Sequence, residues 1–374
     1  MFIYIIFLLF SLGQIGRVSL FNSQINFYLY ELFLLIFFII LFIKNKFKPL
    51  IKNKTKFKYT ILFLIWILLT YITTYYKCSN NCNIISFLYL LRTGFYLFFI
   101  VYSYKLFDTR IRKQINNGIL LFTFLTGAFS IIQYFLYPNL RNLIYLGWDP
   151  HTYRTFGTFL DTSISSAIYG LILLYLFINY KKIGLNKYIK NTLLIIYSII
   201  GLLTYSRIFY LSLFIILVYY LISKKKYVQT VLFILILIAG IFFLPNFQGE
   251  STNLSRVYSI TSRVNDYKQG VKLFKKSPVW GYGYNRLMFI RKDNKDLYGY
   301  PNHSLSSFQS SFLTILVATG LIGFILFILS LFEIGKLSEF LKFGMLFLSL
   351  FSLGDNILLH PFILFLLLFF VSDS

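Results

Sequence analysis

Three arginines and one histidine have the side chains for chemistry on a phosphorylated substrate. Arg154, Arg207 and Arg263 stand beside apolar runs or within the longest polar stretch of a very apolar chain, and His303 follows in that same stretch. The planar guanidinium of arginine binds two phosphate oxygens at once, and histidine accepts a proton near neutral pH. These residue types are suited to holding a phosphate group and moving a proton.

The chain that must position them is built for a membrane. Of its 374 residues, 58% are hydrophobic and 21% aromatic, against roughly 45–50% apolar residues in soluble domains. Apolar runs of about 17–22 residues recur, each long enough to cross a ~30 Å hydrocarbon core as a helix. We therefore predict an all-α polytopic membrane protein, a single multi-spanning domain over 1–374. The twelve predicted spans lie near 2–21, 24–43, 59–76, 84–104, 118–137, 157–180, 191–206, 207–223, 227–244, 308–332, 341–354 and 357–371.

The net charge of +24 is explained by topology. With the N-terminus inside, the inner connections carry twenty of the 36 Lys and Arg residues, seven of them in 44–58, and the short outer connections carry five. This asymmetry follows the positive-inside rule and places both termini in the cytoplasm. Ten more basic residues lie in one large outer loop, 245–307, between the ninth and tenth predicted spans. Because the charge has this origin, we expect no nucleic-acid partner.

Arg92 lies within a predicted span, where a charge costs about 2.5–3.5 kcal/mol at a helix centre. It is therefore either a functional residue or a structural partner of Glu31 or of a backbone carbonyl. Cys78 and Cys82 fall in an outer loop, and the sequence leaves open whether they form a disulfide or remain two free thiols. Their spacing lacks the further ligands of a zinc site.

The outer loop contains the stretch "SRVNDYKQGVKLFKKSPVWGYGYNRL", 262–287. Its first part, 262–276, has helical spacing, with an apolar stripe of Val264, Tyr267, Val271 and Phe274, and predicts a short amphipathic helix on the outer membrane surface. Pro278 ends this helix, and the glycines of "GYGY" favour a tight turn. Because this turn lies on the non-cytoplasmic face, we exclude a nucleotide-binding loop.

These segments resemble the O-antigen polymerase and ligase family, which includes capsular-polysaccharide polymerases. The resemblance rests on the stretch just quoted, on "NHSLSSFQSSFLTILVATGLIGFILFIL", on "YRTFGTFLDTSISSAIYGL" and on "LLTYSRIFYLSL". In ligase-like members a His precedes the first Gly of a GxxG by eleven residues. That position is Gln309 here, and His303 stands six residues earlier.

The resemblance implies transfer of a glycan from an undecaprenyl-pyrophosphate donor to a sugar hydroxyl, on the outer face of the bacterial cytoplasmic membrane. It assigns the pyrophosphate to arginines, since negative charge develops on the leaving group. The candidates are Arg154, Arg207, Arg263 and, with weaker support, Arg256. His303 is the expected general base or a further pyrophosphate contact, and Asp266 and Asp161 are alternative bases.

Aromatic side chains offer faces for sugars or anchors at the interface. The candidates for sugar binding are Tyr267, Trp280, Tyr282 and Tyr284, whereas Trp148 is better suited to anchoring. We expect no metal and no cofactor, and we assign Gly320 and Gly323 to close helix packing. The expected partners are the lipid-linked oligosaccharide and the bilayer, with the chain-length regulator and flippase of the same pathway as candidate protein partners.

Three functions are compared. A repeat-unit polymerase for O-antigen or capsule is the leading hypothesis, and an O-antigen ligase of lipopolysaccharide assembly is its near relative. A flippase for the same lipid-linked oligosaccharide is the third, but it predicts pseudo-repeated halves and charges in many spans. One charged span residue and one large outer loop favour the enzymes.

Overall fold

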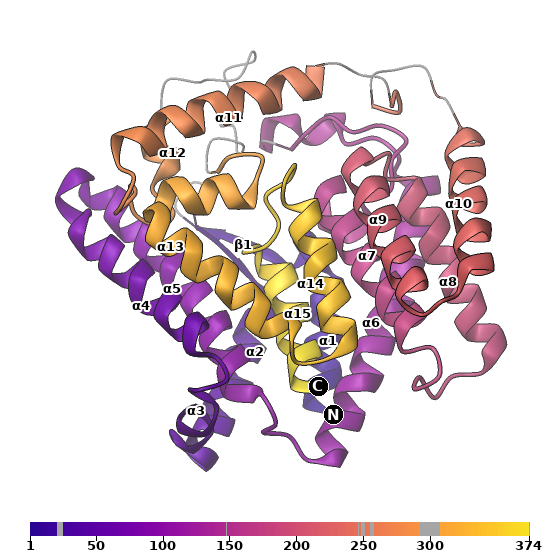
Figure 1. Cartoon of the computed structure of the whole chain (residues 1–374), viewed down its shortest axis with the longest axis horizontal. Helices are drawn as coiled ribbons and strands as arrows, with labels where there is room; N and C mark the ends of the chain where they lie inside the picture. The colour runs from indigo at the N-terminus through magenta and orange to yellow at the C-terminus, as the bar shows by residue number, and fades with distance from the viewer. Residues whose placement is uncertain are drawn as a thin grey trace.

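Helices form almost the whole fold (Figure 1). The computed structural model describes residues 1–20, 25–146, 148–245, 247, 251–254, 258–291 and 307–373. The first half contains α1 (Phe2–Ser11), α2 (Leu29–Asn45), α3 (Lys48–Asn53), α4 (Lys58–Thr73), α5 (Asn80–Ser103), α6 (Thr109–Leu136) and α7 (Thr162–Ile178). The second half contains α8 (Lys187–Leu202), α9 (Arg207–Ser223), α10 (Tyr227–Phe242), α11 (Tyr258–Lys276), α12 (Leu287–Ile290), α13 (Ser311–Gly335), α14 (Glu339–Phe351) and α15 (Pro361–Asp373).

Three of these helices, α5, α6 and α13, are long and apolar enough to cross a membrane by length and composition. Six shorter helices of 10–17 residues are also apolar. Each of the twelve predicted spans contains one helix, and α3, α11 and α12 lie between spans. A polytopic membrane protein is thus supported, whereas the number of twelve crossings is not confirmed.

The first two predicted spans contain a short antiparallel hairpin, so the all-α prediction was wrong at this point. α1 ends at Ser11, and the chain turns at Gly13, which has a left-handed φ of 53°. A side chain at Gly13 would meet the Thr158 carbonyl oxygen at 2.7 Å, so glycine is required there. Strand β1 (Arg17–Leu20) then pairs with β2 (Ile25–Tyr28). Apolar runs this short do not distinguish strand from helix.

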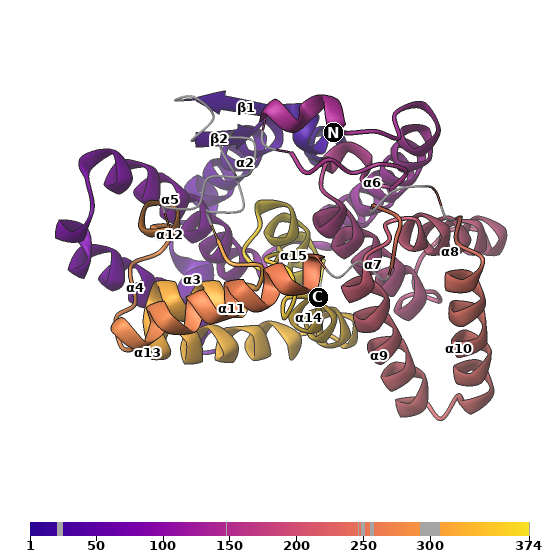
Figure 2. The same cartoon turned by 90° about the horizontal axis from the view of Figure 1, so that it is seen from above.

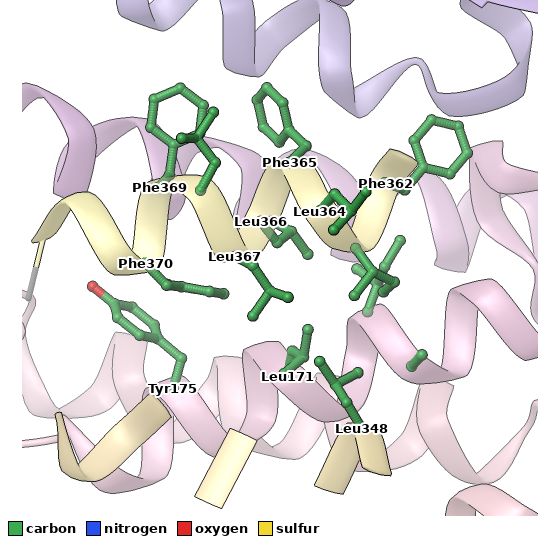
Figure 3. Packing of buried hydrophobic residues seen from close by; sticks show 14 of the residues in the cluster. Leu171, Tyr175, Leu348, Phe362, Leu364, Phe365, Leu366, Leu367, Phe369 and Phe370 are labelled. Atoms are coloured by element: carbon green, nitrogen blue, oxygen red, sulfur yellow. The ribbon is translucent and has the colours of Figure 1, made fainter. Parts of the chain in front are cut away.

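The C-terminal helix lies at the centre of the hydrophobic core. Every residue of α15 from Phe362 to Ser372 is buried. Figure 3 shows Phe365 and Phe369 on one side of the helix and Phe370 facing Tyr175 on the other. A helix that is apolar all round must be covered on all sides, and α5, α6 and α7 all contact it.

Helix α13 is interrupted at Gly320, whose φ of 69° and ψ of −174° are not helical. The break leaves the carbonyls before it without donors from the helix. Donors from other segments reach the carbonyls of Val317, Ala318 and Thr319. The backbone N–H of Tyr282 donates to the Val317 carbonyl at 3.1 Å, and that of Gly283 donates to the Ala318 carbonyl at 2.8 Å. The Trp66 indole N–H donates to the Thr319 carbonyl at 2.8 Å.

The "GYGY" segment is therefore a turn that fits into the break in α13. Gly281 has a φ of 66°, and a Cβ there would lie 2.5 Å from the Ala318 carbonyl. Gly320 faces the same turn, because a Cβ there would lie 2.0 Å from the Val279 carbonyl oxygen. The predicted tight turn is confirmed. Of the two glycines assigned to close helix packing, Gly323 lies beside Trp66 of α4 as expected, whereas Gly320 allows the break in α13.

Helices α3 and α11 lie at opposite ends of the bundle, and both termini lie at the end that carries α3 (Figure 1). We call the end that carries α11 the outer end. This arrangement agrees with the placement of 44–58 and 245–307 on opposite sides, although the sides of a membrane remain a prediction.

Two questions that the sequence left open are answered by contacts. Arg92 and Glu31 form a two-pronged ion pair, with Nε–Oε1 at 2.7 Å and Nη2–Oε2 at 2.9 Å, and Arg92 also donates to the Asn26 carbonyl. The structural interpretation of Arg92 is confirmed. Cys78 and Cys82 are joined by a disulfide.

Candidate functional site

Helix α11 runs along α13 at the outer end (Figure 2), packed on one face and open on the other. Gly270 permits the close approach, since a Cβ there would lie 2.6 Å from the Leu313 side chain. Leu273 and Phe274 pack on a small cluster formed by Leu287, Phe308, Leu313 and Val317. The predicted amphipathic helix is confirmed and begins four residues earlier, at Tyr258.

The open face carries most of the predicted apolar stripe. Val264, Tyr267 and Val271 are 46%, 38% and 43% exposed, whereas Phe274 packs inward. With Ile260, Arg263 and Lys268, these three residues line an open groove of about 660 Å³. Arg263 is thus one of two basic residues in an otherwise apolar groove.

Arg263 reaches from α11 to the connection between α14 and α15. Its Nη2 lies 3.4 Å from Oδ1 of Asp355, and its Nε is buried without a hydrogen-bond partner in the described part of the chain. Tyr267, one turn later, donates to the Leu353 carbonyl. Gly354 lies between Arg263 and Ile208, because a Cβ there would clash with the Ile208 side chain at 2.5 Å and would touch Arg263 Cζ at 3.7 Å.

Asp355 has a perturbed acidity. Burial raises its pKa to about 6, and the neighbouring Asp161 raises it further, while Arg263 opposes the shift. Asp161 precedes α7 and accepts from the backbone N–H groups of Ser163 and Ile164 at 2.7 and 3.1 Å. A buried carboxyl group with a raised pKa therefore lies beside Arg263, and the charge of a second, Asp161, acts on Asp355.

Arg207 and Arg154 meet the same short segment, 251–254. Arg207 Nη1 donates to the Leu254 carbonyl at 3.2 Å, and Arg154 Nε donates to the Ser251 carbonyl at 2.6 Å. Arg207 lies next to Ile208, which together with Arg263 surrounds Gly354. Arg207 is therefore close to Arg263, whereas Arg154 is 4% exposed and joins the site through the backbone of 251–254.

A second acidic group on α11 is fully engaged. Asp266 accepts from Arg291 Nη2 at 2.7 Å and from the Gln309 backbone N–H at 2.9 Å. Arg291 also donates to Gln269 and to the Ser307 carbonyl, and the Gln309 side chain donates to Ser262 at 3.0 Å. This network ties α11 to the residues that follow α12 and to those that precede α13, and it engages both carboxylate oxygens of Asp266.

Comparison with protein families gives one match over this region: residues 192–328 match the family described as O-antigen ligase. This region of the chain is therefore similar to the O-antigen ligase family. The match covers less than half of the chain and runs from α8 into α13, so it includes Arg207, Arg263 and Gln309. A comparison with curated proteins gives no match.

The four aromatic candidates, all within the matched region, differ in exposure. Tyr267 and Trp280 are 38% and 44% exposed, and one face of Trp280 stacks on Trp66 with ring centres 5.0 Å apart. Tyr282 packs in the cluster below α11, and the Tyr284 hydroxyl bonds to Thr93 at 2.9 Å. Sugar stacking is thus best suited to Tyr267 and Trp280.

The histidines of the chain differ in their positions. His303 and Arg256 lie outside the described residues. His151, before α7, is hydrogen-bonded to Thr162 at 3.3 Å. His360, in the last predicted span, accepts a hydrogen bond from the Phe362 backbone N–H through its Nδ1 at 3.3 Å. In the described ranges no three His, Cys, Asp or Glu side chains gather as metal ligands.

Sequence reasoning missed Asp355 and Arg291 at this site. The signal for Asp355 was a Gly-Asp pair in "FSLGDNILLH", between the last two predicted spans. An acidic residue so close to two apolar runs is costly, which could have selected it. Arg291 offered no such signal, since it stands in a charged loop where many cations occur.

Proposed function

We propose that the protein is a membrane glycosyltransferase that polymerises repeat units of a surface polysaccharide, O-antigen or capsule, at the outer face of the bacterial cytoplasmic membrane. The donor is an oligosaccharide on undecaprenyl pyrophosphate, and the acceptor is a sugar hydroxyl. The observation that carries the proposal is Arg263. Its Nε is buried without a hydrogen-bond partner in the described residues, and its side chain lines an open, mostly apolar groove at the outer end. The unused donor and the open groove together support a site for an anionic ligand.

The reaction is a substitution at the anomeric carbon. The acceptor oxygen forms a bond to that carbon, the bond to the pyrophosphate oxygen breaks, and the electron pair leaves with undecaprenyl pyrophosphate. Arg263 and Arg207 stabilise the negative charge that develops on this leaving group, and Arg154 fixes the segment 251–254 beside them. Hydrogen bonds that strengthen as the charge grows lower the barrier.

The acceptor proton needs a base. His303 is the residue proposed for this role from the family pattern. Asp355 is the second candidate, because burial raises its pKa to about 6 and its contact with Arg263 is long, at 3.4 Å. Asp266 is a weaker candidate, because both of its carboxylate oxygens already accept hydrogen bonds, from Arg291 and from the Gln309 N–H.

An O-antigen ligase is the second candidate, because the matched family carries that description. Deletion of the gene followed by electrophoresis of surface glycans distinguishes the two. Loss of a polymerase leaves single repeat units attached to the surface, whereas loss of a ligase leaves none attached and lipid-linked polymer accumulates. A normal glycan profile in the deletion strain contradicts both.

The location of the site has its own test. Reporter fusions at Lys295 and Lys54 should report opposite sides of the membrane, with Lys295 outside. A cytoplasmic Lys295 contradicts the topology and the assignment of the site.

A further inference from the structure

A second arginine of the same segment is buried without a counter-ion in the described residues. Arg286 follows the "GYGY" turn and is 1% exposed. Its partners are neutral: Nη1 donates to Thr74 Oγ1, and Nη2 donates to Asn83 Oδ1 at 2.7 Å and to the Tyr71 carbonyl at 3.3 Å. The guanidinium also lies over the Tyr71 ring, 4.6 Å from its centre. A buried cation without a carboxylate depends on every neutral acceptor being in place.

Asn83 is the central acceptor in this arrangement, and the disulfide is beside it. Asn83 is 3% exposed, and its neighbour Cys82 is fully buried. The Asn83 side chain donates to the carbonyls of Tyr75 and Cys78 at 3.1 and 3.3 Å. The disulfide joins Cys82 to Cys78, so it fixes the carbonyl that orients the Asn83 amide. The orientation of the amide decides whether oxygen or nitrogen faces Arg286.

Further contacts bind the turn to the same two helices. Ser86 donates to the Asn285 carbonyl at 3.1 Å, and Thr93 bonds to the Tyr284 hydroxyl at 2.9 Å. On its other side the turn occupies the break in α13 through Tyr282 and Gly283. Figures 1 and 2 both show α12, which begins directly after Arg286, beside the outer ends of α4 and α5.

The turn connects α11 to Arg291, which both belong to the candidate site. It follows α11, which carries Arg263 and Asp266, and it precedes Arg291, which holds Asp266. A turn held only by α13 and its own backbone could shift along α13, and α11 would shift with it. A displacement of about 1 Å at a catalytic group can cost about a hundredfold in rate.

We propose that Arg286 is a positioning residue. The set of acceptors around its guanidinium, formed by Thr74, Asn83 and the Tyr71 carbonyl and here called the seat of Arg286, is complete only when Cys78 and Cys82 are oxidised. An extracytoplasmic thiol oxidant must therefore act on this protein before its candidate site is aligned. Oxidation removes two electrons and two protons from the two thiols, and a disulfide of the oxidant accepts them and becomes a dithiol. The alignment of Arg263 for glycan transfer rests on the proposed function, whereas the oxidation-dependent seat of Arg286 does not.

The experiment uses the full-length protein purified in lipid nanodiscs, so that folding precedes the change of redox state. The protein is treated with dithiothreitol, freed of it, and then reoxidised with oxidised glutathione. Trypsin cleavage after Arg286 and after Lys276 reports the seat, and extension of a lipid-linked glycan reports transfer. The variants are Cys78→Ser with Cys82→Ser, Arg286→Gln, and Lys276→Gln as the matched control for an exposed cation on the same segment.

We expect reduction to expose Arg286 to trypsin and to slow transfer about tenfold or more, and reoxidation to restore both. The double serine variant should match reduced wild type in every condition. The Arg286→Gln variant should transfer slowly and ignore reductant, while Lys276→Gln should respond as wild type does.

The proposal is overturned if trypsin cleavage after Arg286 and glycan transfer are each equal in the oxidised, reduced and double-serine proteins. The disulfide would then stabilise only its own loop. A cleavage change without a change in transfer overturns the positioning role. Redox-dependent cleavage in a protein that transfers no glycan in any state upholds the seat of Arg286 and contradicts the proposed function instead.

Discussion

Arg92 and Arg263 are both arginines in apolar surroundings, and they differ in how completely they are paired. Arg92 has a two-pronged ion pair with Glu31, a carbonyl partner at Asn26 and the Tyr28 ring 4.9 Å below it. Arg263 has one contact of 3.4 Å with Asp355 and a buried Nε without a partner in the described residues. A fully paired buried cation stabilises a fold, and an incompletely paired one has capacity for a ligand.

The largest effect should come from breaking the complete pair. Arg92→Ala leaves the Glu31 carboxylate buried and unpaired, which costs about 3–5 kcal/mol. We expect the variant to unfold earlier in detergent and to accumulate poorly. Arg92→Met together with Glu31→Leu should recover most of that stability. Wild-type stability of the single variant would show that the pair is not structural.

The base should matter next. His303→Ala should remove about 10²–10⁴-fold of the transfer rate at unchanged protein level. Gln309→Ala should be milder, because both its backbone and its side chain are already engaged, with Asp266 and Ser262. The measurement is surface-glycan chain length in the deletion strain. Loss from Gln309→Ala alone assigns the family's His position to 309.

The incomplete pair is tested by a conservative change. Arg263→Lys keeps the charge but loses the planar fork, and we expect about a hundredfold less transfer with normal stability. Chain length is again measured in the deletion strain, at matched membrane abundance. Normal chains in this variant mean that the pyrophosphate contact must lie at Arg154 and Arg207.

The pH dependence of stability tests the carboxyl group that is paired with Arg263. The folded pKa of Asp355 is about 6 against an ordinary 3.8, so between pH 4 and 6 the folded state binds more protons than the unfolded state. Stability should therefore fall by about 2–3 kcal/mol as pH rises through this window.

Thermal unfolding in detergent between pH 4 and 7 measures this effect. Asp355→Asn should flatten this slope, because it removes the group whose pKa is raised. A slope that Asp355→Asn leaves unchanged contradicts the assignment of this titration to Asp355.

The smallest effect should come from the exposed lysines of α11. Lys275→Ala with Lys276→Ala removes about 1 kcal/mol of attraction to anionic head groups per residue, which salt screens. We expect nearly normal chain length at physiological salt. A failure of this variant while Arg263→Lys functions makes the segment an electrostatic tether, in contradiction to the comparison above.

Sequence predicted much of the fold because its signals are local. The apolar runs marked one helix at each expected span, the spacing over 262–276 marked α11, and the paired glycines marked the turn at 281–284. Sequence failed near 17–28, where short apolar runs formed a hairpin. The periodicity of so few residues does not decide between strand and helix.

The sequence by itself determined that this is an apolar, helical protein with basic and aromatic residues gathered in one outer segment, because composition and spacing follow directly from the order of residues. Tertiary structure alone decided which of those residues meet. Asp355 reaches Arg263 across 92 residues, and Arg286 reaches Asn83 across 203. Such contacts depend on how helices cross and where α13 breaks, and no local pattern encodes the distance between two side chains that far apart in the chain.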